Sequence, residues 1–394
     1  MSLFSPKKDG EVFLVFDIGS GSVGGAIVLT SQGHHPRILY NFRSDIPFQE
    51  EATGVRLLSL MLRALSQVVL AITHEGFDVA GFFGHRPRIR EALISLSAPW
   101  VVSKTSLLKL RNSKPMPITP ETFMALLRES ASETDSERGV PKGSVQIEQK
   151  LIKSVIDGYE AASPYEKVAR EAEFAVFGSF SLPKVTERVS DSITQLIHCQ
   201  HVSFHSFALA AFAVLREQYP NEENFILTDV SGEQTELSIV KKGVLAQTAT
   251  FPFGRNHLIR ALRKGVGLPP GGAAALFKMH AEQSGTGRFF ERAEKIIEIA
   301  ARGWRDQFSK TLSAFSEEVF LPRTIFLTAD DDVIPLFKRM IAEGDFTALT
   351  ISPAAFEVVA IGSDVIASLV TWNPSLPPDP FLGLICVFAN QLRR

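Results

Sequence analysis

Two segments of the chain join an aspartate to a turn of small residues at the end of an apolar strand. In the first segment, residues 12–16 form the strand and Asp17 ends it. The turn that follows is made of Gly19, Ser20, Gly21 and Ser22. In the second segment, residues 225–227 form the strand and lead to Asp229. The residues that follow it and could face a ligand are Ser231, Gly232, Gln234 and Thr235.

Facing hairpins of this kind are suited to hold a polyphosphate and Mg2+. Backbone N–H groups of a small-residue turn can point at phosphate oxygens, and the carboxylates of Asp17 and Asp229 can hold hydrated Mg2+ through water. The plainer alternative is that each carboxylate caps N–H groups of its own turn. The glycines serve the tight turns under either interpretation. Because the arrangement occurs twice, the sequence predicts two related domains that face each other.

Composition narrows the classes of protein that the chain can belong to. Its 394 residues favour two or more domains, and 45% hydrophobic residues with 21% charged residues are typical of a globular protein. The formal net charge of -2 gives no electrostatic reason to expect nucleic acid as a partner. Two cysteines fit a reducing compartment, and no apolar run approaches the roughly 20 residues of a membrane span. We therefore expect a cytoplasmic protein.

Other catalytic chemistries find little support in the sequence. Three histidines, His198, His201 and His205, lie close together, but the residues between them favour a strand that separates them, and no carboxylate is near in sequence. Serines of the first turn have no histidine-containing partner motif, so a hydrolase triad is not expected. The two hairpins remain the main candidate site.

The last residues of the chain form a separate apolar segment after a proline-rich linker. Residues 374–380 contain four prolines and cannot be helical throughout. Beyond them, one helical face carries an apolar stripe that ends in two arginines: Phe381, Leu384, Ile385, Phe388, Leu392, Arg393 and Arg394. This pattern is typical of an amphipathic helix that lies in a lipid interface, and the alternative is a tail that folds back on the body.

The order of these parts resembles the actin-like ATPase superfamily. The segments DIGSGSVGGAIV and DVSGEQTELSIV are similar to its two phosphate motifs, and SFALAAFAVL is similar to its connecting helix. The strand that ends at Thr328, followed by Ala329 and Asp330, stands where the superfamily has its adenosine motif. Residues 156–180 resemble the inserted domain of the cell-division family FtsA, and the pilus family PilM is a near relative.

The resemblance implies an α/β protein with the actin-like, ribonuclease-H-like two-domain fold, a small inserted α/β subdomain and a C-terminal amphipathic tail. The first domain would comprise residues 1–98 and 185–218, with 99–184 inserted. The second would comprise 219–264 and 321–373, with 265–320 as a helical subdomain. Residues 374–394 would form the linker and tail.

The chain departs from the superfamily where a nucleotide would bind. Glu233 stands in the second turn, where glycines are usual and where a carboxylate would repel a polyphosphate. Asp330 and Asp331 add bulk and charge where a glycine run usually packs under the base. The resemblance therefore implies ATP and Mg2+ as cofactors of a degenerate cleft, and at most a weak ATPase.

The first functional hypothesis is an FtsA-like scaffold that self-associates and tethers the tubulin-like protein FtsZ to the cytoplasmic face of the membrane. The alternative is a PilM-like platform for type IV pilus components, which binds a short peptide of a membrane partner. A nucleotide-free structural protein and a small-molecule kinase are the remaining hypotheses. The terminal helix favours FtsA, because PilM does not need an anchor of its own.

Overall fold

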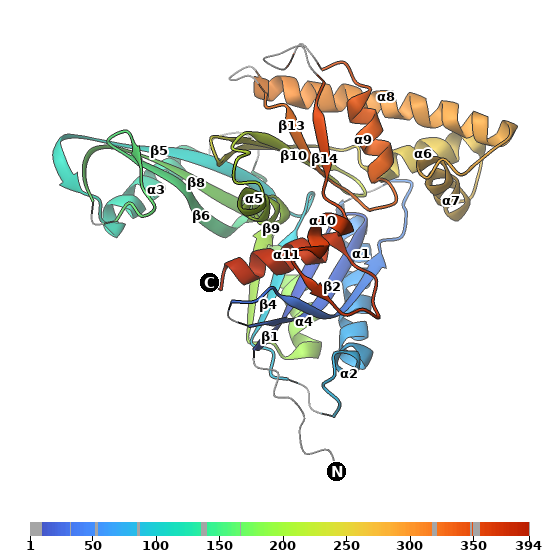
Figure 1. The fold of residues 1–394 in the computed structure, drawn as a ribbon, viewed down its shortest axis with the longest axis horizontal. Coiled ribbons are helices and arrows are strands. Elements are labelled where there is room, and N and C mark those ends of the chain that lie inside the picture. Colours follow the sequence, from blue (N-terminus) through green and yellow to red (C-terminus); the bar gives the residue numbers. More distant parts are fainter. Residues whose placement is uncertain are drawn as a thin grey trace.

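The computed structural model describes residues 10–31, 33–51, 54–84, 87–134, 140–165, 167–316, 321–346, 349 and 355–393. Three sheets of six, five and four strands organise these residues. The first two sheets form the two halves of the body, and the four-stranded sheet extends away from it (Figure 1). The architecture confirms the expected α/β body of two domains with a small inserted α/β subdomain.

The first domain is built on the six-stranded sheet, with strand order β15-β3-β2-β1-β4-β9. Its strands are β1 (Glu11–Ile18), β2 (Ser22–Thr30), β3 (Arg37–Asp45), β4 (Glu91–Leu96), β9 (His201–Ser206) and β15 (Thr371–Trp372). Alternate residues of β1 face opposite sides, as the period of a strand requires. Leu14 and Phe16 pack with helices α1 (Gly54–Ala71) and α4 (Pro183–Ile197). Phe13 and Val15 pack with α5 (Phe207–Gln218) and α11 (Pro380–Gln391).

The second domain is built on the five-stranded sheet, with strand order β12-β11-β10-β13-β14. Its strands are β10 (Phe225–Val230), β11 (Thr235–Lys241), β12 (Val244–Phe251), β13 (Thr324–Thr328) and β14 (Glu357–Ala360). One face is covered by α6 (Arg255–Val266), α7 (Pro270–Ala281), α8 (Arg288–Ser316) and α9 (Ile334–Ala342). These helices share one hydrophobic core with the sheet, centred on the fully buried Trp304.

In its described residues, the inserted subdomain consists of a four-stranded sheet and one helix. Its strands, in the order β5-β8-β6-β7, are β5 (Val102–Pro117), β6 (Val145–Ile156), β7 (Tyr159–Glu160) and β8 (Val168–Ser181). Helix α3 (Pro120–Thr134) packs on it around Phe123 and Phe174, whose ring centroids lie 5.3 Å apart. This small core is separate from those of the body. The base of the sheet is held by Thr248 of β12, whose Oγ1 donates to the Ser103 carbonyl at 2.6 Å.

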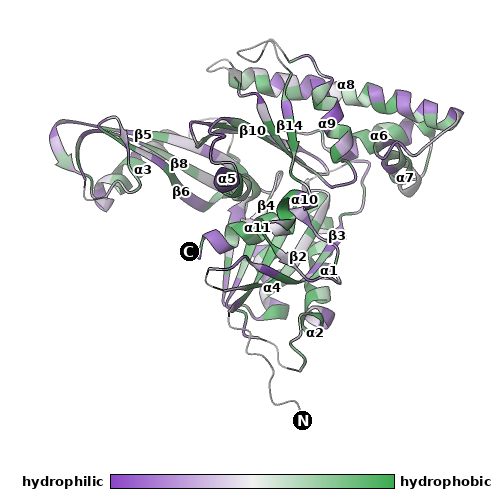
Figure 2. Ribbon diagram, viewed as in Figure 1, coloured by the Kyte–Doolittle hydropathy of each residue, from purple (hydrophilic) through white to green (hydrophobic). Residues whose placement is uncertain are grey.

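The terminal helix α11 lies inside the body rather than outside it, which corrects the membrane-tail prediction. Ile385 is fully buried, and Leu384 and Phe388 are almost so. They pack with α5 and β1, in a helix that Figure 2 shows as hydrophobic along most of its length. Asp379 caps the helix by accepting from the Leu382 N–H at 3.0 Å. The apolar stripe expected to face lipid is therefore part of the core.

The chain also returns to the first domain earlier than expected. Strand β15 pairs in parallel with β3 of the first sheet, although residues up to 373 were assigned to the second domain. Only the short helix α10 (Ser363–Ala367) lies between β14 and β15. Residues after 362 thus complete the first domain, and the linker that follows them is pinned by Asn41, whose side chain donates to the Pro377 carbonyl at 3.0 Å.

One helical stretch is long and apolar enough to span a membrane, although no such stretch was expected from the sequence. Helix α1 continues through a π-helical turn η1 (Ile72–Gly76) and a short α2 (Phe77–Val79), and residues Gly54–Val79 meet the length and composition of a membrane span. Half of its most apolar window is buried in the protein. Leu65 and Val68 pack on the first sheet with Ile193 of α4, so α1 serves as a core helix.

Candidate functional site

Both predicted hairpins form at equivalent places in the two domains. Asp17 is the penultimate residue of β1 and lies opposite Gly24 of β2, and Asp229 is the penultimate residue of β10 and lies opposite Glu236 of β11. Each of these first strands also pairs in parallel with a central neighbour, β4 or β13. The paired hairpins expected from the sequence are thus brought face to face.

The tips of the two hairpins contact each other directly. The Oγ atoms of Ser20 and Ser231 lie 3.0 Å apart, and the Ser20 N–H donates to Ser231 Oγ at 3.1 Å. The Glu233 N–H donates to Ser20 Oγ at 2.9 Å. A Cβ atom on Gly232 would lie 2.5 Å from the Gly21 Cα, so glycine is required here for the backbones to approach each other.

Asp17 forms an ion pair with Arg43 of β3. Arg43 Nη2 donates to Asp17 Oδ2 at 2.9 Å, and Nη1 donates to Ser22 Oγ at 2.9 Å. The other side of the guanidinium donates to Asp379, with Nε–Oδ2 at 2.6 Å and Nη2–Oδ1 at 2.9 Å. Burial raises the pKa of Asp17 to about 6, although Arg43 opposes the shift. One cation is therefore shared by two buried carboxylates.

Asp229 is hydrogen-bonded within its own domain. Thr328 Oγ1 donates to Asp229 Oδ1 at 2.8 Å, which brings together two residues that the sequence placed in the site. Burial raises the pKa of Asp229 well above its usual range. Among the residues that the structure describes, Asp17 accepts from Arg43 and Asp229 accepts from Thr328, and no hydrogen bond joins either carboxylate to an N–H group of its own turn.

Glu233, Gln234 and Thr235 serve the second domain itself. The buried Glu233 carboxylate accepts from Arg260 Nη2 at 2.6 Å and from Asn256 Nδ2 at 2.8 Å, both on α6. The Gln234 carbonyl accepts from the Ser231 N–H at 3.0 Å. The Thr235 hydroxyl donates to the Phe253 carbonyl and accepts from Trp304 Nε1, at 2.7 and 3.0 Å.

The residues of the cleft do not fit a nucleotide polyphosphate with its metal ion. The space between the hairpins, lined by Asp17, Asp229, Arg43 and Asp330, is about 20 Å³. That volume holds about one water molecule. Asp330 is ion-paired with Arg255, and Ser363 Oγ donates to Asp331 Oδ2 at 2.7 Å, so the expected adenosine turn is also filled by side-chain contacts.

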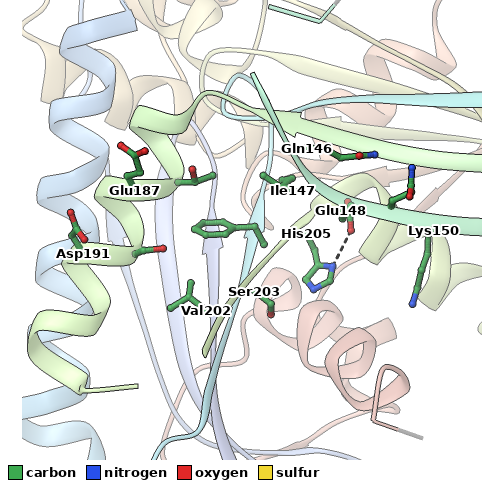
Figure 3. A pocket seen from close by; sticks show the side chains of 13 residues that line it. Gln146, Ile147, Glu148, Lys150, Glu187, Asp191, Val202, Ser203 and His205 are labelled. Carbon is green, nitrogen blue, oxygen red and sulfur yellow. Dashed lines mark hydrogen bonds and ion pairs between the residues drawn. The ribbon is translucent and has the colours of Figure 1, made fainter. Parts of the chain in front are cut away.

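A larger groove lies elsewhere, between the inserted subdomain and the first domain. Its volume is about 810 Å³. One wall is the edge of β6, the floor is β9, and the far wall is α4 (Figure 3). Figure 3 shows Glu187 and Asp191 of α4 on the side opposite Gln146 and Lys150 of β6.

Glu148 joins the walls of this groove. Its Oε1 accepts from Ser179 Oγ of β8, from Ser206 Oγ and from the Ser206 N–H, each at 2.7 Å. Its Oε2 lies 2.9 Å from His205 Nδ1 (Figure 3). Nothing in the sequence marks Glu148, because its partners are more than thirty positions away in the chain. No carboxylate lies near His205 in the sequence, and the fold brings one there.

The charged end of α11 is also turned toward the body. Arg393 forms an ion pair with Glu91 of β4, and its guanidinium lies 3.8 Å from the centre of the Phe13 ring. Phe381 lies under Arg43 at 5.2 Å, whereas Leu392 is 38% exposed. Arg394, the last residue expected to contact lipid, lies outside the described residues.

Comparison with solved structures supports the fold. A chain of the PilM–PilN type IV pilus biogenesis complex matches with a TM-score of 0.63 at 13% identity, over 96% of this chain and 98% of that one. The ethanolamine utilization protein EutJ from Carboxydothermus hydrogenoformans matches at 0.48 and 10% identity, over 98% and 92%. A Bacteroides thetaiotaomicron protein with an actin-like ATPase fold matches at 0.41 and 8% identity, over 98% and 99%.

No protein-family profile matches the chain, and a comparison with curated proteins finds no match. The comparison of structures shows that the chain has the actin-like ATPase fold, which it shares over nearly its whole length with the pilus protein PilM. At 13% identity this likeness concerns the fold alone.

Proposed function

We propose that this chain is a PilM-like platform protein that binds an extended segment of a membrane-bound pilus-type partner. The observation that carries the proposal is the groove between β6, β9 and α4. It is far larger than the space between the hairpins and joins the inserted subdomain to the first domain. The PilM–PilN complex offers a fold of the same kind that works with a protein partner.

Strand addition is the binding mode that the groove favours. β9 is the last strand of the first sheet, and β6 is paired on one side only over residues 145–153 within the part of the chain described. An extended peptide can use the free N–H and C=O groups of such edges. Irregular pairing of β6 with β8 around Ile147 bends this edge where it meets the first domain.

The charges of the groove favour a partner segment with basic side chains. Glu187 and Asp191 lie one helical turn apart on α4, and both are exposed. Glu148 already contacts His205 and Ser206. The negative charges of the groove that remain available to a partner are therefore those of Glu187 and Asp191 on α4. Complementary charge raises the association rate and fixes the register of a bound segment.

The position of α11 favours the pilus-type alternative over the FtsA-like scaffold. The terminal helix was the feature that distinguished an anchored division protein, and its apolar residues lie in the core. Nothing among the observations points to FtsZ as a partner. Attachment to the cytoplasmic face of the membrane would then depend on the bound partner.

The test is binding of an extended, lysine- and arginine-rich peptide that represents the cytoplasmic segment of a single-span pilus-type membrane protein. The double variant Glu187→Lys, Asp191→Lys should bind about tenfold more weakly or worse, since it replaces attraction by repulsion. The matched control, Glu291→Lys with Asp306→Lys, reverses two exposed charges on α8, outside the groove.

Equal binding by the groove variant and the control would contradict the proposed site. Failure of the wild-type chain to bind that segment, together with co-sedimentation with FtsZ polymers, would replace the proposal by the division-scaffold hypothesis.

A further inference from the structure

The cleft between the hairpins contains its own cation. A carboxylate of the first hairpin would have to stay available to a hydrated metal ion for Mg–polyphosphate to bind there. The Arg43 guanidinium already takes Asp17 Oδ2 and Ser22 Oγ, each at 2.9 Å. A second cation beside it would be repelled, and guanidinium keeps its charge under all ordinary conditions.

Gly24 shows that the hairpin is shaped around this arginine. A Cβ atom at Gly24 would lie 2.7 Å from Arg43 Nη2 and 3.3 Å from a methyl group of Leu382. The glycine of β2 therefore makes room for a side chain of this protein. Through Asp379, the cap of α11, the same guanidinium ties the hairpin to the terminal helix.

A second arginine closes the opposite side. Arg255 begins α6, and its backbone N–H donates to the Ser231 carbonyl at 3.1 Å. Its side chain pairs with Asp330, and a Cβ on Gly21 would lie 3.4 Å from its Nη2. The charges that a nucleotide's phosphates would recruit are thus already paired with carboxylates of the chain.

We infer that this protein is closed by its own side chains and does not use ATP: Arg43 stands in for the metal ion, and Ser20 and Ser231 join the two domains directly. The hairpins of the two domains are held together without a nucleotide. This inference does not depend on which partner the groove binds.

The double variant Ser20→Cys, Ser231→Cys tests the inference, because the two Oγ atoms lie 3.0 Å apart. Under mild oxidation it should form a disulfide across the cleft, at the same rate with and without millimolar Mg-ATP. The single variants Ser20→Cys and Ser231→Cys are the controls, and both native cysteines are buried. A fluorescent ATP analogue with Mg2+ should show no saturable binding to the wild-type chain.

Two results would overturn the inference. One is saturable binding of the analogue by the wild-type chain, which needs no cysteine variant. The other is a cross-linking rate that falls about tenfold or more when Mg-ATP is added, because the hairpins would then be separating around the nucleotide.

Discussion

At the scale of single residues, buried polar side chains join the two hairpins to each other and tie the first hairpin to α11. Arg43 lies between Asp17 and Asp379, and Ser20 meets Ser231. Burial disfavours the charge on Arg43, but Asp379 and Asp17 outweigh it and raise the pKa of the guanidinium. Removing one member of such a buried group leaves an uncompensated charge, which costs more than the intact pair contributes.

Arg43→Ala should therefore lower the free energy of unfolding by about 3 kcal/mol. The control is Arg302→Ala, whose ion pair with Glu298 is largely exposed and should contribute less than about 1 kcal/mol. Urea unfolding monitored by circular dichroism measures both. If Arg43→Ala lowers the free energy of unfolding no more than the control does, the contacts of Arg43 with Asp17 and Asp379 do not stabilise the fold as proposed.

The buried carboxyl group of Glu236 should give the protein an unusual dependence of stability on pH. Burial raises its pKa from 4.5 to about 7, so the folded state prefers the protonated form. Its contribution is present below pH 4.5 and is lost as the pH rises through 7. Between pH 5 and 8 the titration of Glu236 should lower the free energy of unfolding by roughly 2 kcal/mol.

Glu236→Gln removes that titration and should be more stable than the wild type at pH 8 but not at pH 5. Urea unfolding at the two pH values measures the difference, and the exposed Glu291→Gln should keep the wild-type dependence. Parallel profiles for the wild type and Glu236→Gln would show that Glu236 is not titrating in the folded state.

At the scale of elements, the sequence predicts the two hairpins, the inserted α/β subdomain and the helical character of residues 265–320, because each has a clear period or clear turn residues. It misassigns α11. The spacing of Phe381, Leu384, Ile385 and Phe388 describes an apolar face and does not identify what covers that face. Here the cover is α5 and the first sheet, which only tertiary structure reveals.

Ile385→Ala should lower the free energy of unfolding by about 3 kcal/mol, because a fully buried side chain leaves a cavity. Leu392→Ala, at a half-exposed position of the same segment, is the control and should cost less than about 1 kcal/mol. The folded wild-type chain should not sediment with liposomes. Binding to liposomes that is lost in Ile385→Ala while stability is unchanged would restore the membrane role.

At the scale of the whole molecule, the two-domain body and the inserted subdomain enclose a groove that the sequence did not disclose. Its walls come from β6, α4 and β9, which lie far apart in the chain, and its central contact joins Glu148 to His205 and Ser206. The hairpins were visible in the sequence because their residues are adjacent. Their direct contact was not, because it depends on how the two domains meet.

Hydrogen–deuterium exchange with the partner's cytoplasmic segment tests the central claim most directly. We expect the backbone amides of residues 146–150 and 201–206 to gain protection when the segment is added, equally with and without Mg-ATP. The turns at 19–22 and 231–234 should not change. Protection of those turns by Mg-ATP, with no change at β6 and β9, would contradict an adaptor that binds through the groove and works without nucleotide.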